Sequence, residues 1–173
     1  MIDALILAGG RATRFGGIAK HELVIDGERI IDRQAALLHP RVREILVSAR
    51  EPVSGFRTVQ DYLGEGPLAG IAAGLQASDA ERLLVIAGDM PDVTGELLDR
   101  LIAGSGTVGV KIDDRIEPLA CVVIRSLLPE IEDRLRTNRW SVGELLTASA
   151  TTWLTDLDSR WLRNVNSPAD LRE

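Results

Sequence analysis

Short apolar runs recur along the chain and alternate with stretches whose apolar residues follow a helical period. Five runs predict strands, at Ile2 to Leu7, Ile45 to Val47, Leu83 to Ala87, Thr107 to Ile112 and Leu119 to Ile124. Continuous apolar runs are typical of strands that are buried on both faces. Because helical stretches separate most of them, the pattern predicts an α/β fold with a mostly parallel sheet and helices on both sides.

Local signals mark several helix starts and turns. Thr94 precedes the helical period of residues 97–102, a Ser141–Glu144 capping box opens another helix, and residues 31–38 carry a further apolar face. Asp26-Gly27 and Asp113-Asp114 are typical of tight turns between strands.

Two glycines lie on one face of a further predicted helix. Pro67 opens this helix over residues 66–75, and Gly70 and Gly74 are four positions apart in it. The missing side chains would allow either tight packing on the sheet or close approach of a nucleotide. The sequence leaves both explanations open.

Size and composition narrow the class of protein. The 173 residues fit one domain over residues 1–173, and a net charge of -6 argues against a general nucleic-acid binder. No apolar run is long enough to span a membrane, and Asp3 interrupts the N-terminus before any leader pattern, so we expect a cytoplasmic protein. Cys121, the only cysteine, lies in an apolar run and is expected to be buried.

The segment LAGGRATRFGGIAK, residues 7–20, has the composition of a phosphate-binding loop after the first strand. Its glycines let phosphate approach backbone N–H groups, and Arg11, Arg14 and Lys20 supply positive charge. The spacing fits neither the P-loop nor the G-x-G-x-x-G dinucleotide motif. The alternative is a solvated glycine turn, which would not require three interleaved cations.

Asp89 follows the apolar run that ends at Ala87, in the sequence GDMP. A carboxylate at a strand end beside a phosphate loop is the ligand that Mg²⁺ takes when substrate phosphates complete its coordination. The alternative role is a turn that begins the next helix. Near the C-terminus, Asn164 and Asn166 place two amides on one side of an extended segment, where they can bind a polar ligand.

Taken in order, LAGGRATRFGG, Lys20, GPLAGI, GDMP, EPLACVV and NVNSPADL resemble the molybdenum cofactor guanylyltransferases, within the wider nucleotidyltransferase family. The resemblance covers nearly the whole chain, and GPLAGI and NVNSPADL are its more discriminating parts. It implies a three-layer α/β/α, Rossmann-like nucleotidyltransferase fold. It also implies transfer of GMP from GTP to the phosphate of molybdenum-carrying molybdopterin, with release of pyrophosphate.

The resemblance also implies a set of site residues. Lys20, Arg14 and Asp89 would be catalytic, with Asp89 holding Mg²⁺, and Asn164 and Asn166 would bind molybdopterin. The residues implied to bind GTP are Leu7, Ala8, Gly9, Gly17, Lys20, Ser48, Asp61 and Asp89. Implied partners beyond the substrates are molybdenum-insertion proteins or chaperones of apo-molybdoenzymes, with no nucleic acid and no membrane.

Three positions depart from the family pattern. Family members often carry aspartate at the position of Ala19 and glycine at that of His21, and a well-known member has asparagine at that of Ser48. Two other functions are therefore kept as alternatives. One is a molybdenum cofactor cytidylyltransferase or a related enzyme with another acceptor, and the other is a nucleotide-binding module without turnover.

Overall fold

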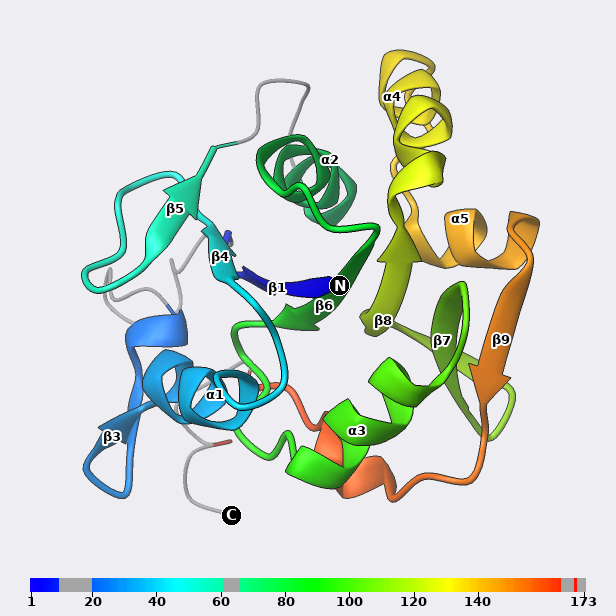
Figure 1. Ribbon diagram of the computed structural model, residues 1–173. Helices are drawn as coiled ribbons and strands as arrows, with labels where there is room; N and C mark the ends of the chain where they lie inside the picture. The colour runs from blue at the N-terminus through cyan, green and yellow to red at the C-terminus, as the bar shows by residue number, and fades with distance from the viewer. Residues whose placement is uncertain (10–19, 61–65, 166–169, 171–173) are drawn as a thin grey trace.

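A seven-stranded sheet forms the centre of the molecule in the computed structural model, which describes residues 1–9, 20–60, 66–165 and 170 (Figure 1). The strands lie side by side in the order β5-β4-β1-β6-β8-β7-β9. In chain order they are β1 (Ile2–Leu7), β4 (Ile45–Ser48), β5 (Arg57–Val59), β6 (Arg82–Ala87), β7 (Thr107–Ile112), β8 (Arg115–Ile124) and β9 (Thr151–Leu154).

The sheet is mostly parallel, as the sequence predicts. β1, β4, β5 and β6 pair in parallel, β9 pairs in parallel with β7, and β8 runs antiparallel to both of its neighbours. Residues 4–6 of β1 and 83–86 of β6 are completely buried. Burial on both faces explains why these strands are continuous apolar runs in the sequence.

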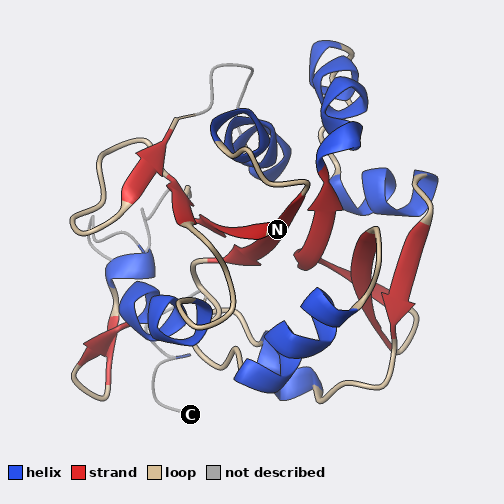
Figure 2. Cartoon of the chain, in the orientation of Figure 1, coloured by secondary structure: helices blue, strands red, loops and turns tan. Residues whose placement is uncertain are grey.

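Helices cover both faces of the sheet, which gives three layers (Figure 2). Along β1, Ala4 and Ile6 pack on one side and Leu5 packs on the other, because successive strand residues point to opposite faces. The first face is covered by α1 (Ile30–Leu38) and α3 (Gly95–Ala103), and the second by α2 (Pro67–Ala77), α4 (Leu128–Arg136) and α5 (Val142–Ala148). The three-layer α/β/α expectation is confirmed.

Most of the local start and turn signals act as predicted. The side chain of Thr94 accepts a hydrogen bond from the N–H of Leu97, and Pro67 is the first residue of α2. Asp26 and Gly27, with φ of 53° and 84°, form the turn of a small separate hairpin. Its strands are β2 (Val24–Ile25) and β3 (Glu28–Arg29). The described residues also form three short 3₁₀ helices, η1 (Lys20–Glu22), η2 (Arg125–Leu127) and η3 (Ser159–Leu162).

Three features go beyond the sequence prediction. β8 begins at Arg115 rather than Leu119, because its first half, which is only partly buried, pairs with β7 across the Asp113-Asp114 turn. α4 and β9 are additional elements.

Cys121 is completely buried, as expected, and burial raises the pKa of its thiol to about 12, so it stays protonated.

The two glycines of α2 are explained by close packing of this helix on the sheet. A Cβ atom at Gly70 would lie 2.7 Å from both Leu7 Cδ2 and Ser48 Oγ, and one at Gly74 would lie 2.9 Å from Leu5 Cδ2. At such separations a Cβ atom would force the neighbouring side chains to shift. Of the two explanations left open by the sequence, the structure supports packing.

An ion pair with a buried carboxylate stabilises the amino end of the sheet. Asp3, at the start of β1, is completely buried and accepts hydrogen bonds from Arg43 at 3.0 and 2.7 Å and from Ser78 Oγ at 2.6 Å. Burial raises the pKa of the carboxyl group, but these hydrogen bonds and the charge of Arg43 outweigh burial and lower the pKa below 3.8. The pair links β1 to the segment before β4 and to the end of α2.

No helix among the described residues is long and apolar enough to cross a bilayer.

We predict that Asp3→Ala lowers the free energy of unfolding by about 2–3 kcal/mol near neutral pH, because it leaves the donors of Arg43 and Ser78 without their acceptor. A lowered pKa in the folded state stabilises the protein above the unfolded-state value of about 3.9 and ceases to do so as the pH falls through the folded-state value. Urea unfolding between neutral and acidic pH should therefore show the difference between wild type and variant narrowing below about pH 4. A difference that stays constant to lower pH would contradict this role.

Candidate active site

The carboxyl ends of β1, β4 and β6 meet at one edge of the sheet. Leu7, the last residue of β1, lies opposite Ser48 of β4 on one side and Ala87 of β6 on the other. The pairing continues past the strands, because the N–H of Ala8 donates to Ser48 O and the N–H of Gly88 donates to Leu7 O, both at 2.9 Å. Ligands of open parallel sheets bind at this edge, so the loops that leave it form the candidate site.

The charges of Lys20 and Asp89 are paired at this edge. Lys20 Nζ lies 2.8 Å from Asp89 Oδ2, although the two residues are 69 positions apart in the sequence. Their side chains are 26% and 21% exposed, so the pair is accessible from solvent while resting on the sheet. Lys20 and the GDMP segment therefore meet at this edge.

The C-terminal segment folds back against the Asp89 loop. The N–H of Val165 donates to the carbonyl oxygen of Asp89 at 2.8 Å, and the Val165 side chain is completely buried with Leu23 and Ile30. Asn164 is half-buried, and its amide lies 3.4 Å from Leu162 O. This fixed segment brings one asparagine of the predicted pair next to the loop that carries Asp89.

The predicted site residues divide into two groups. The structure describes Leu7, Ala8, Gly9, Lys20, Ser48, Asp89 and Asn164, and all of these lie at or beside the carboxyl edge. The predicted residues Arg14, Gly17, Asp61 and Asn166, together with Arg11, lie outside the described residues.

Ser48 and His21 are two of the buried polar residues at this edge. The Ser48 side chain is 5% exposed and its Oγ points to the place where Gly70 of α2 lacks a side chain. His21 is 6% exposed, and a Cβ atom at Gly88 would lie 3.2 Å from His21 Cβ. Burial lowers the pKa of His21, against the opposite effect of Glu22. The Cβ atom of His21 therefore packs against Gly88, in the loop that carries Asp89.

The donor set fits magnesium bound together with phosphates. Among the described residues, no three His, Cys, Asp or Glu side chains gather to form a complete metal site. Mg²⁺ does not need such a cluster, because one or two carboxylates suffice when substrate phosphates and water supply the other oxygens. Asp89, at the strand edge beside Lys20, is the carboxylate placed to do this.

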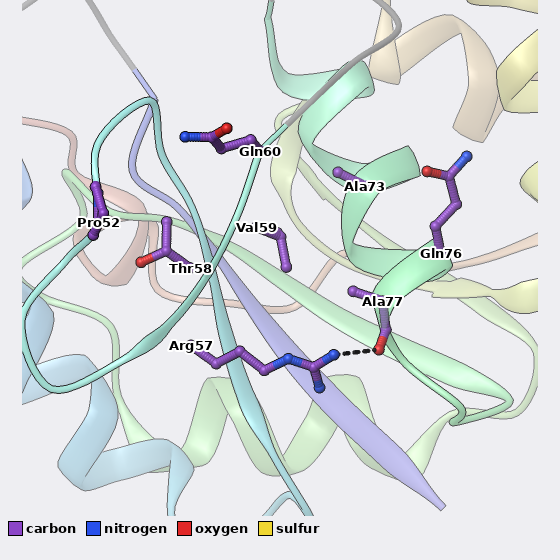
Figure 3. A pocket seen from close by; sticks show the side chains of 8 residues that line it. All are labelled: Pro52, Arg57, Thr58, Val59, Gln60, Ala73, Gln76 and Ala77. Carbon is purple, nitrogen blue, oxygen red and sulfur yellow. Dashed lines mark hydrogen bonds between the residues drawn. The ribbon is translucent and has the colours of Figure 1, made fainter.

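A groove lies at the outer edge of the sheet, between β5 and α2 (Figure 3). Its volume is about 510 Å³, and β4 and β1 separate β5 from the strand that leads to Asp89. The polar side chains on its rim bond within the protein, Arg57 to Ala77 O, Gln60 to Arg50 O and Gln76 to Glu132. The polar rim of this groove therefore makes its contacts within the protein, away from the Lys20–Asp89 pair.

Comparison with known proteins identifies the family of this chain. Residues 4–150 match the family model described as a MobA-like NTP transferase domain. The "Probable molybdenum cofactor guanylyltransferase" of Peptoclostridium acidaminophilum is 30% identical over 99% of this chain and 87% of its own length. The "Molybdenum cofactor guanylyltransferase" of Pseudomonas fluorescens is 36% identical over 81% of this chain and 74% of its own.

A solved structure confirms the architecture. The crystal structure of molybdopterin-guanine dinucleotide biosynthesis protein A from Archaeoglobus fulgidus superposes with a TM-score of 0.80 at 24% identity, over 99% of this chain and 95% of the other. At that identity the likeness shows the fold, and the curated relatives show the family. The chain is therefore a nucleotidyltransferase of molybdenum cofactor biosynthesis and belongs to the molybdenum cofactor guanylyltransferase family.

Proposed function

We propose that the enzyme transfers GMP from GTP to the phosphate of molybdenum-carrying molybdopterin and releases pyrophosphate. The observation that carries this proposal is the Lys20–Asp89 pair at the carboxyl edge of the sheet. The ammonium group suits a triphosphate and the carboxylate suits a metal ion, so the pair offers both contacts that a magnesium nucleotide requires. The names of the curated relatives support guanine as the base and molybdopterin as the acceptor.

The reaction is a displacement at phosphorus. An oxygen of the acceptor phosphate attacks the α-phosphorus of GTP, a new phosphorus–oxygen bond forms, and the bond to the β-phosphate oxygen breaks. Pyrophosphate leaves with that electron pair. The attacking phosphate is already ionised near neutral pH, so the enzyme needs neither a nucleophile of its own nor a general base.

The residues of the chain align charges in this reaction. Lys20 neutralises the triphosphate and the departing pyrophosphate, and we propose that Arg14, with Arg11, adds positive charge. Asp89 would hold Mg²⁺, which when bound stabilises negative charge on the phosphate oxygens. Because two anions must approach each other, this neutralisation and alignment is the main contribution to rate.

Gly9, the first glycine after β1, is consistent with nucleotide binding at the backbone of residues 7–9. A Cβ atom at Gly9 would meet only Ser48 O, at 3.9 Å, among the described residues, so packing there does not require glycine. A phosphate that approaches the backbone does require it. The N–H of Ala8 already donates to Ser48 O, and Leu7 O already accepts from the N–H of Gly88. We therefore propose that the nucleotide contacts the backbone of Leu7, Ala8 and Gly9 through groups other than these two. Gly17, Ser48 and Asp61 would complete the GTP site.

The proposed reaction is tested by measuring magnesium-dependent pyrophosphate release with each common nucleoside triphosphate, with and without molybdenum-carrying molybdopterin. We expect release with GTP only when the acceptor is present. Preference for CTP would instead indicate a cytidylyltransferase. If no triphosphate supports turnover while GTP still binds, the chain is a binding module and the proposal is wrong.

We predict that Lys20→Ala slows turnover by roughly two to three orders of magnitude, because it removes a charge that faces the triphosphate. The partly exposed Lys20–Asp89 pair contributes at most about 1 kcal/mol to stability, so the fold should remain intact. Steady-state rates and thermal unfolding check both points. Arg139→Ala, which removes an exposed cation paired with Asp133 on α4, is the matched control and should leave the rate unchanged. A Lys20→Ala rate above half that of wild type would exclude the phosphate role.

We predict that Asn164→Ala combined with Asn166→Ala weakens molybdopterin binding, by on the order of 1 kcal/mol for each lost hydrogen bond. The Val165 N–H to Asp89 O bond is a backbone contact and survives both changes, so the Asp89 loop should keep its position. GTP affinity, measured by calorimetry without the acceptor, should therefore stay within about twofold of wild type. Loss of GTP binding with unchanged molybdopterin binding would show that the two substrates had been assigned to the wrong ends of the site.

A further inference from the structure

A buried amide from α1 holds the loop that carries Asp89. Gln34 is 1% exposed, and its Nε2 donates to Ala87 O at 2.8 Å and to Met90 O at 2.9 Å. These carbonyl groups stand on either side of Gly88 and Asp89. The amide orientation follows from the contacts, because an oxygen in the place of Nε2 would face two carbonyl oxygens.

The backbone around Asp89 is bonded from three directions. Gln34 binds it from α1, Leu7 O accepts from the N–H of Gly88, and Val165 donates to Asp89 O. The loop also fits tightly against β1, because a Cβ atom at Gly88 would lie 3.1 Å from Leu7 O. The direction in which the Asp89 carboxylate leaves the backbone therefore depends on these few contacts.

Packing alone does not explain a glutamine at this position. Its neighbours on the buried face of α1 are Ile30, Ile31, Ala35 and Leu38, all 5% exposed or less. A buried amide is costly unless its hydrogen bonds are made, and Gln34 Oε1 accepts none from the described part of the chain. An apolar residue would pack here without that cost, so the two N–H contacts to the loop are what the glutamine adds.

We propose that Gln34 is a positioning residue for nucleotidyl transfer, which fixes the Asp89 carboxylate by holding the carbonyls on both sides of Gly88–Asp89. This inference rests on the proposed role of Asp89 as the magnesium ligand. Gln34 does not touch the substrate in this role. It acts through the backbone, as the partners that orient metal ligands do in other proteins.

The test compares Gln34→Met, which keeps the size of the side chain and removes both donors, with wild type and two reference variants. GTP affinity is measured by calorimetry without the acceptor, at a series of magnesium concentrations, so that no turnover is involved. Asp89→Asn is the reference for loss of the metal ligand. Ser78→Ala is the matched structural control, because Ser78 is also 1% exposed and makes two hydrogen bonds, to Asp3 and Ala80, at the opposite end of the sheet.

We expect Gln34→Met to need about tenfold more magnesium, or more, to reach the wild-type GTP affinity, as is typical when a partner that orients a metal ligand is lost. The GTP affinity of Gln34→Met without magnesium should stay within about twofold of the wild-type affinity. Its maximal rate of turnover should fall below that of wild type. Ser78→Ala should lower the thermal midpoint while its magnesium requirement stays at the wild-type value. The readout therefore separates positioning from general stability.

The outcomes separate this inference from the proposed function. If Asp89→Asn raises the magnesium requirement and Gln34→Met does not, Gln34 has no positioning role and the metal assignment stands. If Asp89→Asn leaves the requirement unchanged, the metal assignment and the role of Gln34 are both wrong. Should Gln34→Met not fold, Gln34→Glu replaces it. Its protonated carboxyl donates one hydrogen bond at most, so its magnesium requirement should still exceed that of wild type, and an equal requirement would overturn the proposal.

Discussion

The position of β1 between two parallel neighbours is the constraint on which the site depends. β1 is buried on both faces, and its last residue, Leu7, is in register with Ser48 on one side and Ala87 on the other. Three chain segments therefore leave the sheet at the same edge, and the loops that follow must meet there. Lys20 and Asp89 come together for this reason, although nearly seventy residues separate them.

The two ends of the sheet are held by different kinds of polar contact. At the amino end, a buried carboxylate is paired with the charge of Arg43 and accepts a further hydrogen bond from the hydroxyl of Ser78. At the carboxyl end, the neutral amide of Gln34 and backbone hydrogen bonds hold the loop. Neutral groups fix the loop without competing for the ions that the proposed reaction brings to this edge, and the charges of Lys20 and Asp89 remain partly exposed.

The C-terminal segment joins the two substrate ends of the proposed site. Val165 is buried against Leu23 and Ile30, and its N–H binds the carbonyl of Asp89. A segment that would bind the acceptor is thus attached to the loop that would bind the metal. In the proposed reaction this connection sets the acceptor phosphate and the α-phosphorus of GTP in a fixed relation, which is the alignment that a displacement between two anions requires.

The sequence by itself determined the parts of the protein that local chemistry controls. Continuous apolar runs gave β1 and β6, the Asp26-Gly27 turn needed its residue types, and the loop after β1 and Asp89 indicated phosphate and metal chemistry. Contacts between distant segments were decided only by the tertiary structure. β9 is a half-exposed edge strand that pairs only with β7 among the described strands, and the first half of β8 is partly buried and pairs with the same neighbour. In the sequence Gln34 follows two charged residues of the same helix, Asp32 and Arg33, and its partners lie more than fifty residues away. No local pattern in the sequence predicts these pairings. The free energy that they contribute is gained only when the helices pack on the sheet, because packing buries polar groups that must then find a hydrogen-bond partner.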